Sequence, residues 1–249
     1  MPRRGAVAAT LDLIAMHLSI HRRHALAALA ALANPALPAN AQAPAFPQHP
    51  ITLLLPFGPG GIADLTARAV AQAMAASLGQ PLLIDNRPSA GSIVASQAVA
   101  AATPDGHTLL LMSNGHAVAA SLFRKLPFDA QKDFAPVVLL ARFDLALFVA
   151  AGARLPEVPT VAEAGGAALQ RYDVSSWNAL AAPARTPPEV LAQLNRAANE
   201  ALAQPALQRQ LRALGVRPQC GTPEQLRQWL ASATRHWAEV VRGARIELQ

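Results

Sequence analysis

The sequence predicts an α/β protein in which a parallel sheet is flanked by helices. Short apolar runs of strand length alternate along the chain with longer segments whose apolar residues recur at helical spacing. Loops rich in glycine and proline separate these segments, and 52% of the residues are hydrophobic against 14% charged, a balance that can supply a buried core. Strands and helices that alternate in this way are typical of βαβ units.

The first half of the chain contains five expected elements. The apolar run at 51–57 is short enough for a buried strand, and an apolar stripe through Leu65, Ala69 and Ala73 predicts a helix that Gly79 ends. The pattern then repeats, with Pro104-Asp105-Gly106 as a turn before the last strand. In order, the sequence predicts a strand at 51–57, a helix at 61–78, a strand at 81–84, a helix at 92–102 and a strand at 108–112.

The second half begins with apolar runs and ends in helices. The runs at 137–140, 145–150 and 174–182 predict strands. Thr186 is the expected N-cap of a helix with Pro187 at its first position, and Pro205 starts a second helix. Thr222-Pro223-Glu224 repeats the start signal for a final helix, in which Trp229 and Trp237 are eight residues apart on one face, a spacing typical of core residues.

The N-terminus, residues 1–41, reads as a secretory signal peptide, with Met16 as a candidate true start. A basic segment at 21–24 precedes an apolar segment at 25–33, and cleavage is expected after Ala41. The protein is therefore expected in the periplasm. The net charge of +6 is scattered rather than gathered in a run, which argues against nucleic-acid binding. Cys220 is alone, so no intrachain disulfide is possible.

Ligands of such sheets bind outside the carboxyl ends of the strands, where three loops are expected to meet. The first loop, Phe57-Gly58-Pro59-Gly60-Gly61, opens a helix and turns backbone N–H groups outward, which suits an anion. Its glycine spacing matches neither a Walker loop nor the dinucleotide fingerprint, and an ordinary strand-to-helix turn fits the same pattern. Capping of the helix is a better interpretation of Asp64 than ligand contact.

The loop Ser113-Asn114-Gly115-His116 follows the third strand and offers hydroxyl, amide and imidazole groups. We interpret it as a polar binding loop. A hydrolase that uses Ser113 and His116 is the competing interpretation, which the absence of a Gly-x-Ser-x-Gly elbow disfavours. The seven histidines show no metal-ligand spacing, so neither a metal nor a cofactor is expected.

Blocks in the same order across nearly the whole mature chain resemble the Bug (TctC) family of periplasmic solute receptors of tripartite tricarboxylate transporters. The resemblance rests on residues 50–64, 79–81, 85–88, 103–110, 126–137, 155–165, 176–177 and 182–187. It implies a type II periplasmic-binding-protein fold, a monomer without catalytic activity, a small carboxylated or amide solute, and membrane subunits as partners. The ligand loops it implies are Phe57, Gly58, Pro59, Gly60, Gly61 and Asp64, then Ser89, Ala90, Gly91, Ser92 and Ile93, then Ser113, Asn114, Gly115 and His116.

Two departures from the family pattern bear on function. The second loop has fewer glycines than usual, and only Ala151 to Arg154 separate the apolar run at 145–150 from the motif at 155–160. Roughly ninety residues, the size of a small domain, are missing there. The expected organisation is therefore largely one lobe, with its first part at 49–150, a shortened hinge at 151–173 and its C-terminal part at 174–249. We expect weakened or lost solute binding, and the alternative is a degenerate or repurposed periplasmic scaffold that binds no solute.

Overall fold

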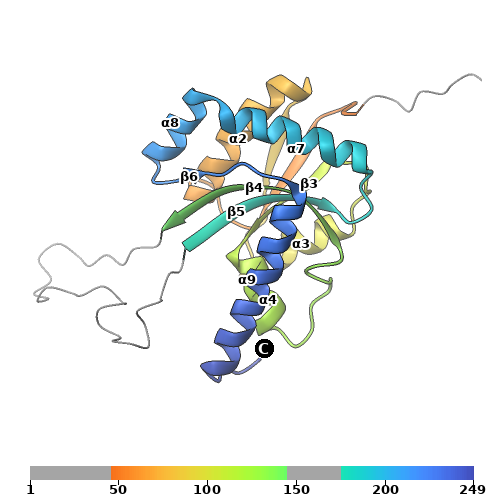
Figure 1. Cartoon of the computed structure of the whole chain (residues 1–249). Helices are drawn as coiled ribbons and strands as arrows, with labels where there is room; N and C mark the ends of the chain where they lie inside the picture. Colours follow the sequence, from red (N-terminus) through yellow and green to blue (C-terminus); the bar gives the residue numbers. More distant parts are fainter. Residues whose placement is uncertain (1–45, 145–174) are drawn as a thin grey trace, which may run out of the picture. The chain divides into compact units, whose positions relative to one another are not determined.

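The computed structural model describes residues 46–144 and 175–249 (Figure 1). The predicted signal peptide at 1–41, the predicted strand at 145–150 and the predicted hinge at 151–173 lie outside these residues. The described residues form one six-stranded sheet in the order β2-β1-β3-β5-β4-β6. Its strands are β1 (Ile51–Leu55), β2 (Leu82–Asn86), β3 (Thr108–Ser113), β4 (Phe134–Asp144), β5 (Ser175–Pro183) and β6 (Arg217–Pro218).

The predicted strands that fall within the described residues are confirmed, but the sheet is mixed rather than parallel. β1 pairs in parallel with β2 and β3, as the βαβ pattern predicts. β5 runs antiparallel to both β3 and β4, and β6 runs antiparallel to β4. Both faces of this sheet are covered, so its strands are apolar throughout whichever way they run. The apolar pattern therefore predicts a buried strand but does not predict its direction. The carboxyl ends of β1, β2, β3 and β4 therefore share one edge with the amino end of β5.

Helices cover both faces of the sheet (Figure 1). On one face α2 and α7 pack against each other and α8 contacts both, and on the other α4 packs along α9 with α3 beside the sheet. The helices are α2 (Ile62–Leu78), the 3-10 turn η1 (Ala90–Ser92), α3 (Ile93–Ala100), α4 (Asn114–Leu122), α7 (Pro188–Ala203), α8 (Pro205–Ala213) and α9 (Pro223–Gly243).

Two apolar cores result from the strand period of two. Leu109 and Leu111 of β3 point into the core beneath α2 and α7, whereas Leu110 and Met112 point into the core beneath α3 and α9. A strand with both faces buried has to be apolar throughout, which explains the unbroken apolar runs of the sequence. Within the described residues, no helix has both the length and the apolar character that a membrane crossing needs.

Helix starts were predicted with mixed success. Thr222 caps α9 as predicted, and its side chain and that of Gln225 form a capping box with each other's backbone N–H groups. The predicted cap of α7 is wrong: Pro187 is the N-cap and Pro188 the first helical residue. The hydroxyl of Thr186 donates instead to the carbonyl of Pro183, 2.8 Å away, which ties it to the preceding strand.

Candidate functional site

The three predicted loops lie along one edge of the sheet, at the ends of neighbouring strands. The first follows β1, the second follows β2 and the third follows β3. Because β1 lies between β2 and β3, the loops are adjacent in space. The topology therefore brings the predicted residues together at the position where α/β sheets hold ligands.

The first loop leaves open space at the start of α2. A Cβ added at Gly58, Gly60 or Gly61 would meet no atom within 4 Å. Gly61 is the N-cap and provides no side-chain hydrogen bond, so the first N–H groups of α2 stay available to solvent or to a ligand. Gly60 has φ +85°, a conformation that glycine adopts without strain. This geometry fits the predicted anion cradle.

Asp64 holds this loop from inside. Its carboxylate accepts from the N–H of Gly60 and from Nε of Arg68, each at 2.9 Å, and from Nδ2 of Asn86 at 3.0 Å. The hydrogen bond from Arg68 lowers the pKa of Asp64 from 3.8 to about 2, although burial opposes this shift. Asp64 is only 2% exposed, so it acts on the loop rather than on solvent. It also occupies one of the N–H groups that the cradle would offer.

The second loop is held by packing. Gly91 has φ +62°, and a Cβ there would lie 2.9 Å from Cε2 of Phe123 on the side facing α4. Ser92 also has φ +62°, which is unusual for a residue other than glycine. The hydroxyl of Ser89 accepts from the N–H of Val94. The glycine therefore serves close approach to α4 rather than an open cradle.

The third loop is the start of a helix that the sequence reading missed. Ser113 is the N-cap of α4, and its hydroxyl accepts from the N–H of Gly115 at 3.2 Å. Nδ2 of Asn114 donates to the carbonyl of Ser175 on β5, also at 3.2 Å. The serine followed by an asparagine was the available signal for a helix start. Asn114 is the residue of this loop that lines a pocket.

His116 is enclosed in the core and is not exposed at the loop. Its Nδ1 is paired with the hydroxyl of Ser96 and its Nε2 with the carbonyl of Ala130, each at 3.0 Å. A carbonyl only accepts, so Nε2 carries the proton and Nδ1 accepts from Ser96. Burial lowers the pKa of His116 and favours this neutral form. With both ring nitrogens engaged elsewhere, His116 does not activate Ser113, which removes the basis for a hydrolase.

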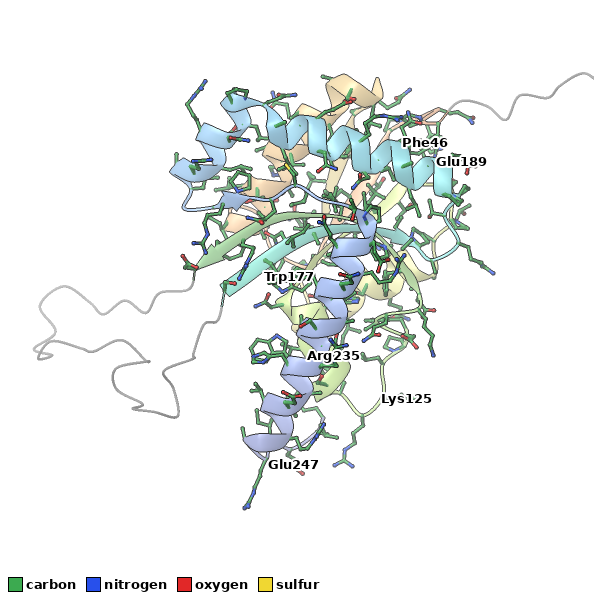
Figure 2. All side chains as sticks on the ribbon, viewed as in Figure 1. Phe46, Lys125, Trp177, Glu189, Arg235 and Glu247 are labelled. Carbon is green, nitrogen blue, oxygen red and sulfur yellow. The ribbon has the colours of Figure 1, made fainter. Side chains whose placement is uncertain are left out.

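A pocket of about 200 Å³ lies at the same edge, beneath α9, and sequence reasoning did not find it. It is lined by Asn114, Arg142, Ser175, Trp177, Trp229, Ser232, Ala233, His236 and Trp237. The predicted packing role of Trp229 and Trp237 is confirmed, since both pack against the core beneath α3 and α9, and both also line this pocket. Trp177, labelled in Figure 2, is 2% exposed on the face of β5 that α9 covers. The sequence signal for this pocket was Arg142, a charged residue that interrupts the apolar run of β4.

A second polar cluster lies at the opposite edge of the sheet. Ligand atoms of His49, Asp105 and His107 lie within 4.8 Å of one another. Sequence spacing gave no sign of this group. The two imidazoles are stacked, with ring centroids 3.8 Å apart and 23° between their planes. Nitrogen lone pairs lie in the ring plane, so stacked rings do not aim at one shared metal ion, and the geometry fits a His107–Asp105 pair at the turn.

Comparison with known proteins gives matches over most of the chain. The family model for the tripartite tricarboxylate transporter family receptor matches residues 66–153 and 150–246. The chain is 27% identical over 319 residues to the UPF0065 protein in the tcbD-tcbE intergenic region of Pseudomonas sp. strain P51, an alignment that covers 90% of this chain and 94% of the relative. This alignment is longer than the chain, so the relative contains residues that have no counterpart here.

Two solved structures have the same fold, and one of them, BugD, is a periplasmic binding protein. BugD matches with a TM-score of 0.71 at 22% identity and covers 82% of this chain and 100% of its own. MatC from Rhodopseudomonas palustris, solved with bound malate, matches with a TM-score of 0.68 at 27% identity and covers 79% of this chain and 100% of its own. The predicted fold class, resemblance and absence of catalytic activity agree with these matches.

Proposed function

Because this chain belongs to the tripartite tricarboxylate transporter receptor family, we propose that it is a periplasmic receptor that binds a small carboxylate. The observation that carries the proposal is the open, glycine-lined start of α2 at the carboxyl edge of the sheet. Helix N-termini attract anions through their free N–H groups and their dipole. The malate bound to the related MatC is a ligand of this chemistry.

The ligand-binding residues of the proposal are those of the three loops, with their roles refined. A Cβ at Gly58, Gly60 or Gly61 would meet no atom within 4 Å, so these glycines leave room for a solute beside the first N–H groups of α2. We propose that the solute is bound there by these N–H groups, while the N–H of Gly60 stays bonded to Asp64. Asp64 and Gly91 are proposed to fix the loops, and His116 to hold α4 against the core. Transfer of the solute to the membrane subunits of a tripartite transporter completes the proposed role.

Thermal melting of the full-length chain with a panel of small carboxylates tests the proposal. A ligand that binds only the folded state raises the melting temperature by mass action, so at least one acid should give a concentration-dependent shift. Malate, citrate, succinate, glutamate, nicotinate and benzoate form the panel. A cooperative melt without a shift for any acid would support the scaffold alternative.

A matched pair of variants locates the site. Gly58→Val fills the open space at the start of α2 without a positive φ, and should reduce the ligand-induced shift strongly. Gly79→Val places the same side chain at the other end of α2, where φ is +70° and no atom lies within 4 Å. This control should lower the baseline melting temperature yet keep the shift. An equal shift in both variants would place the solute elsewhere.

A further inference from the structure

We propose that the pocket beneath α9 binds a monocarboxylate with a planar apolar body, such as an aromatic acid, through the guanidinium of Arg142. This inference goes beyond the proposed function, because it adds a second position for a carboxylate at the same edge of the sheet and names the class of acid that would bind there. The pocket is separate from the glycine loop and shares only Asn114 with the three predicted loops.

Arg142 provides the positive charge of the pocket. Its Nη2 donates to the hydroxyl of Ser175 at 2.7 Å, and its guanidinium carbon lies 4.7 Å from the ring centroid of Trp229. Among the described residues no carboxylate pairs with it, whereas the nearby Arg217 is paired with Asp144. A guanidinium stacked on an indole keeps its edge for in-plane, two-pronged recognition of a carboxylate.

Several buried polar atoms without a hydrogen-bond partner belong to residues that line this pocket. Across residues 46–144 and 175–249, seven buried side-chain polar atoms lack a hydrogen-bond partner, and three of them belong to residues that line this pocket: Asn114 Oδ1, Arg142 Nε and Trp229 Nε1. An unpaired buried polar group is costly, so such groups are usually satisfied by water or a ligand. These atoms are covered, so a small rotation of the side chains would accompany their pairing with a bound acid.

Aromatic walls favour a planar body. The chain has three tryptophans, and Trp177, Trp229 and Trp237 all line the pocket. Indoles stack on flat apolar groups in offset or edge-on arrangements. The volume of about 200 Å³ is several times the ~30 Å³ of one water molecule, which leaves room for a single small ring.

The lining also selects against dicarboxylates. Besides Arg142, the titratable side chain in the lining is His236 at the exposed rim, where it packs edge-on against Trp237. A second carboxylate would face the indoles without a cation and would lose its hydration. Benzoate should therefore bind more tightly than malate or succinate.

Tryptophan fluorescence of the full-length chain, titrated with benzoate, tests the proposal, because every tryptophan reports on the pocket. We expect saturable quenching, with benzamide at least tenfold weaker, since it keeps the ring and loses the charge. Malate should leave the fluorescence unchanged. Isothermal titration calorimetry with benzoate provides a second readout that does not depend on the indoles.

Variants of the arginine separate recognition from folding. Arg142→Met should lower benzoate affinity at least tenfold. Arg142→Lys keeps the charge but loses the planar fork, so its benzoate affinity should lie between those of the wild type and Arg142→Met. Arg217→Met, at an exposed arginine, is the matched control and should bind benzoate normally. If the Arg142 variants do not fold, Trp237→Ala removes part of a wall at a half-buried position and should weaken benzoate several-fold without affecting acetate.

Benzoate affinity equal to benzamide affinity, or unchanged in Arg142→Met, would overturn the proposal. So would unchanged benzoate binding in Trp237→Ala, if that variant has to replace the arginine series. If benzoate fails while another acid of the panel stabilises the chain, the receptor function stands and this assignment of the class is wrong. If no acid binds by any readout, the proposed function itself fails.

Discussion

A single buried carboxylate fixes the first candidate loop. Asp64 joins the loop to α2 through Gly60 and Arg68, and to the end of β2 through Asn86. Asn86 also donates to the carbonyl of Phe57 at 2.9 Å, so the loop is held at both of its ends. Asp64 therefore supports the proposed binding surface from beneath and is itself 2% exposed.

Asp64→Asn should destabilise the protein by about 1–2 kcal/mol at neutral pH, after allowance for the solvent screening of half-exposed Arg68. The folded-state pKa of about 2 lies below the unfolded value of 3.8, so the carboxylate stabilises the fold above pH 3.8. This contribution is lost as pH falls from 3.8 towards 2. Urea unfolding across this range should therefore show a steeper loss of stability in the wild type than in the variant.

Asp85→Asn is the control for this measurement. Asp85 pairs with Arg87 at the surface, where both side chains are more than a third exposed. Exposed pairs contribute little, so this change should cost less than about 0.5 kcal/mol. Equal losses in the two variants would contradict the structural role of Asp64.

At the residue scale, sequence reasoning placed the three candidate loops at one edge of the sheet more accurately than it assigned the roles of their individual side chains. The glycines of the first loop were recognisable because a strand, a turn and a helix follow one another in a known order. The polar neighbours of His116 led to its prediction as a loop residue, whereas it is buried in the first turn of α4. Arg142 and Trp229 are 87 positions apart in the sequence, so only the fold reveals that they stack.

At the level of elements, the second loop and α4 are packed so closely that one glycine is needed. Gly91→Ala combines an unfavourable φ of +62° with a Cβ 2.9 Å from Phe123 and 3.2 Å from Ala119. We expect a loss of about 2–3 kcal/mol in thermal or urea unfolding. This would show that the loop is held by contact with α4.

Gly79→Ala provides the matched comparison. Its φ is +70° but no atom lies within 4 Å, so it should incur the backbone cost alone, about 1–2 kcal/mol. The difference between the two variants measures the packing of the loop on α4. If Gly79→Ala proves as costly as Gly91→Ala, the backbone conformation explains both and close packing does not.

Element positions were more predictable than element directions. Apolar periodicity located β1, β3 and α2 within a few residues, and the start signal at Thr222 located α9. The direction of β5 was not predictable, because its apolar pattern is the same whether it runs parallel or antiparallel to β3 and β4. The capping of α7 by Pro187 shows the same limit, since Thr186 fits a cap locally yet bonds backwards to Pro183.

At the scale of the whole molecule, the described residues form a single layered unit around one sheet. The family model matches in two segments that meet at 150–153, where the sequence analysis expected a missing stretch. Two-lobed receptors bury most of a ligand by closing on it. A ligand held at one sheet edge keeps one side in water, where its hydrogen bonds compete with solvent.

The last prediction follows from this one-sided contact. Ligand binding should leave the radius of gyration in solution unchanged, because residues 46–144 and 175–249 form one unit around a single sheet, with no second lobe among them to close. The affinity for the acid should also fall markedly as the salt concentration rises. The ion pair between the bound carboxylate and Arg142 would be partly exposed, and salt screens such pairs over a Debye length of ~8 Å at physiological concentration. Small-angle scattering with and without a saturating acid, and titrations at low and high salt, provide the measurements. Compaction on binding, together with a salt-independent affinity, would contradict this prediction and show that the ligand is enclosed, either by residues 145–174 or by another copy of the chain. A series of protein concentrations would separate these two cases, because only enclosure by another copy depends on protein concentration.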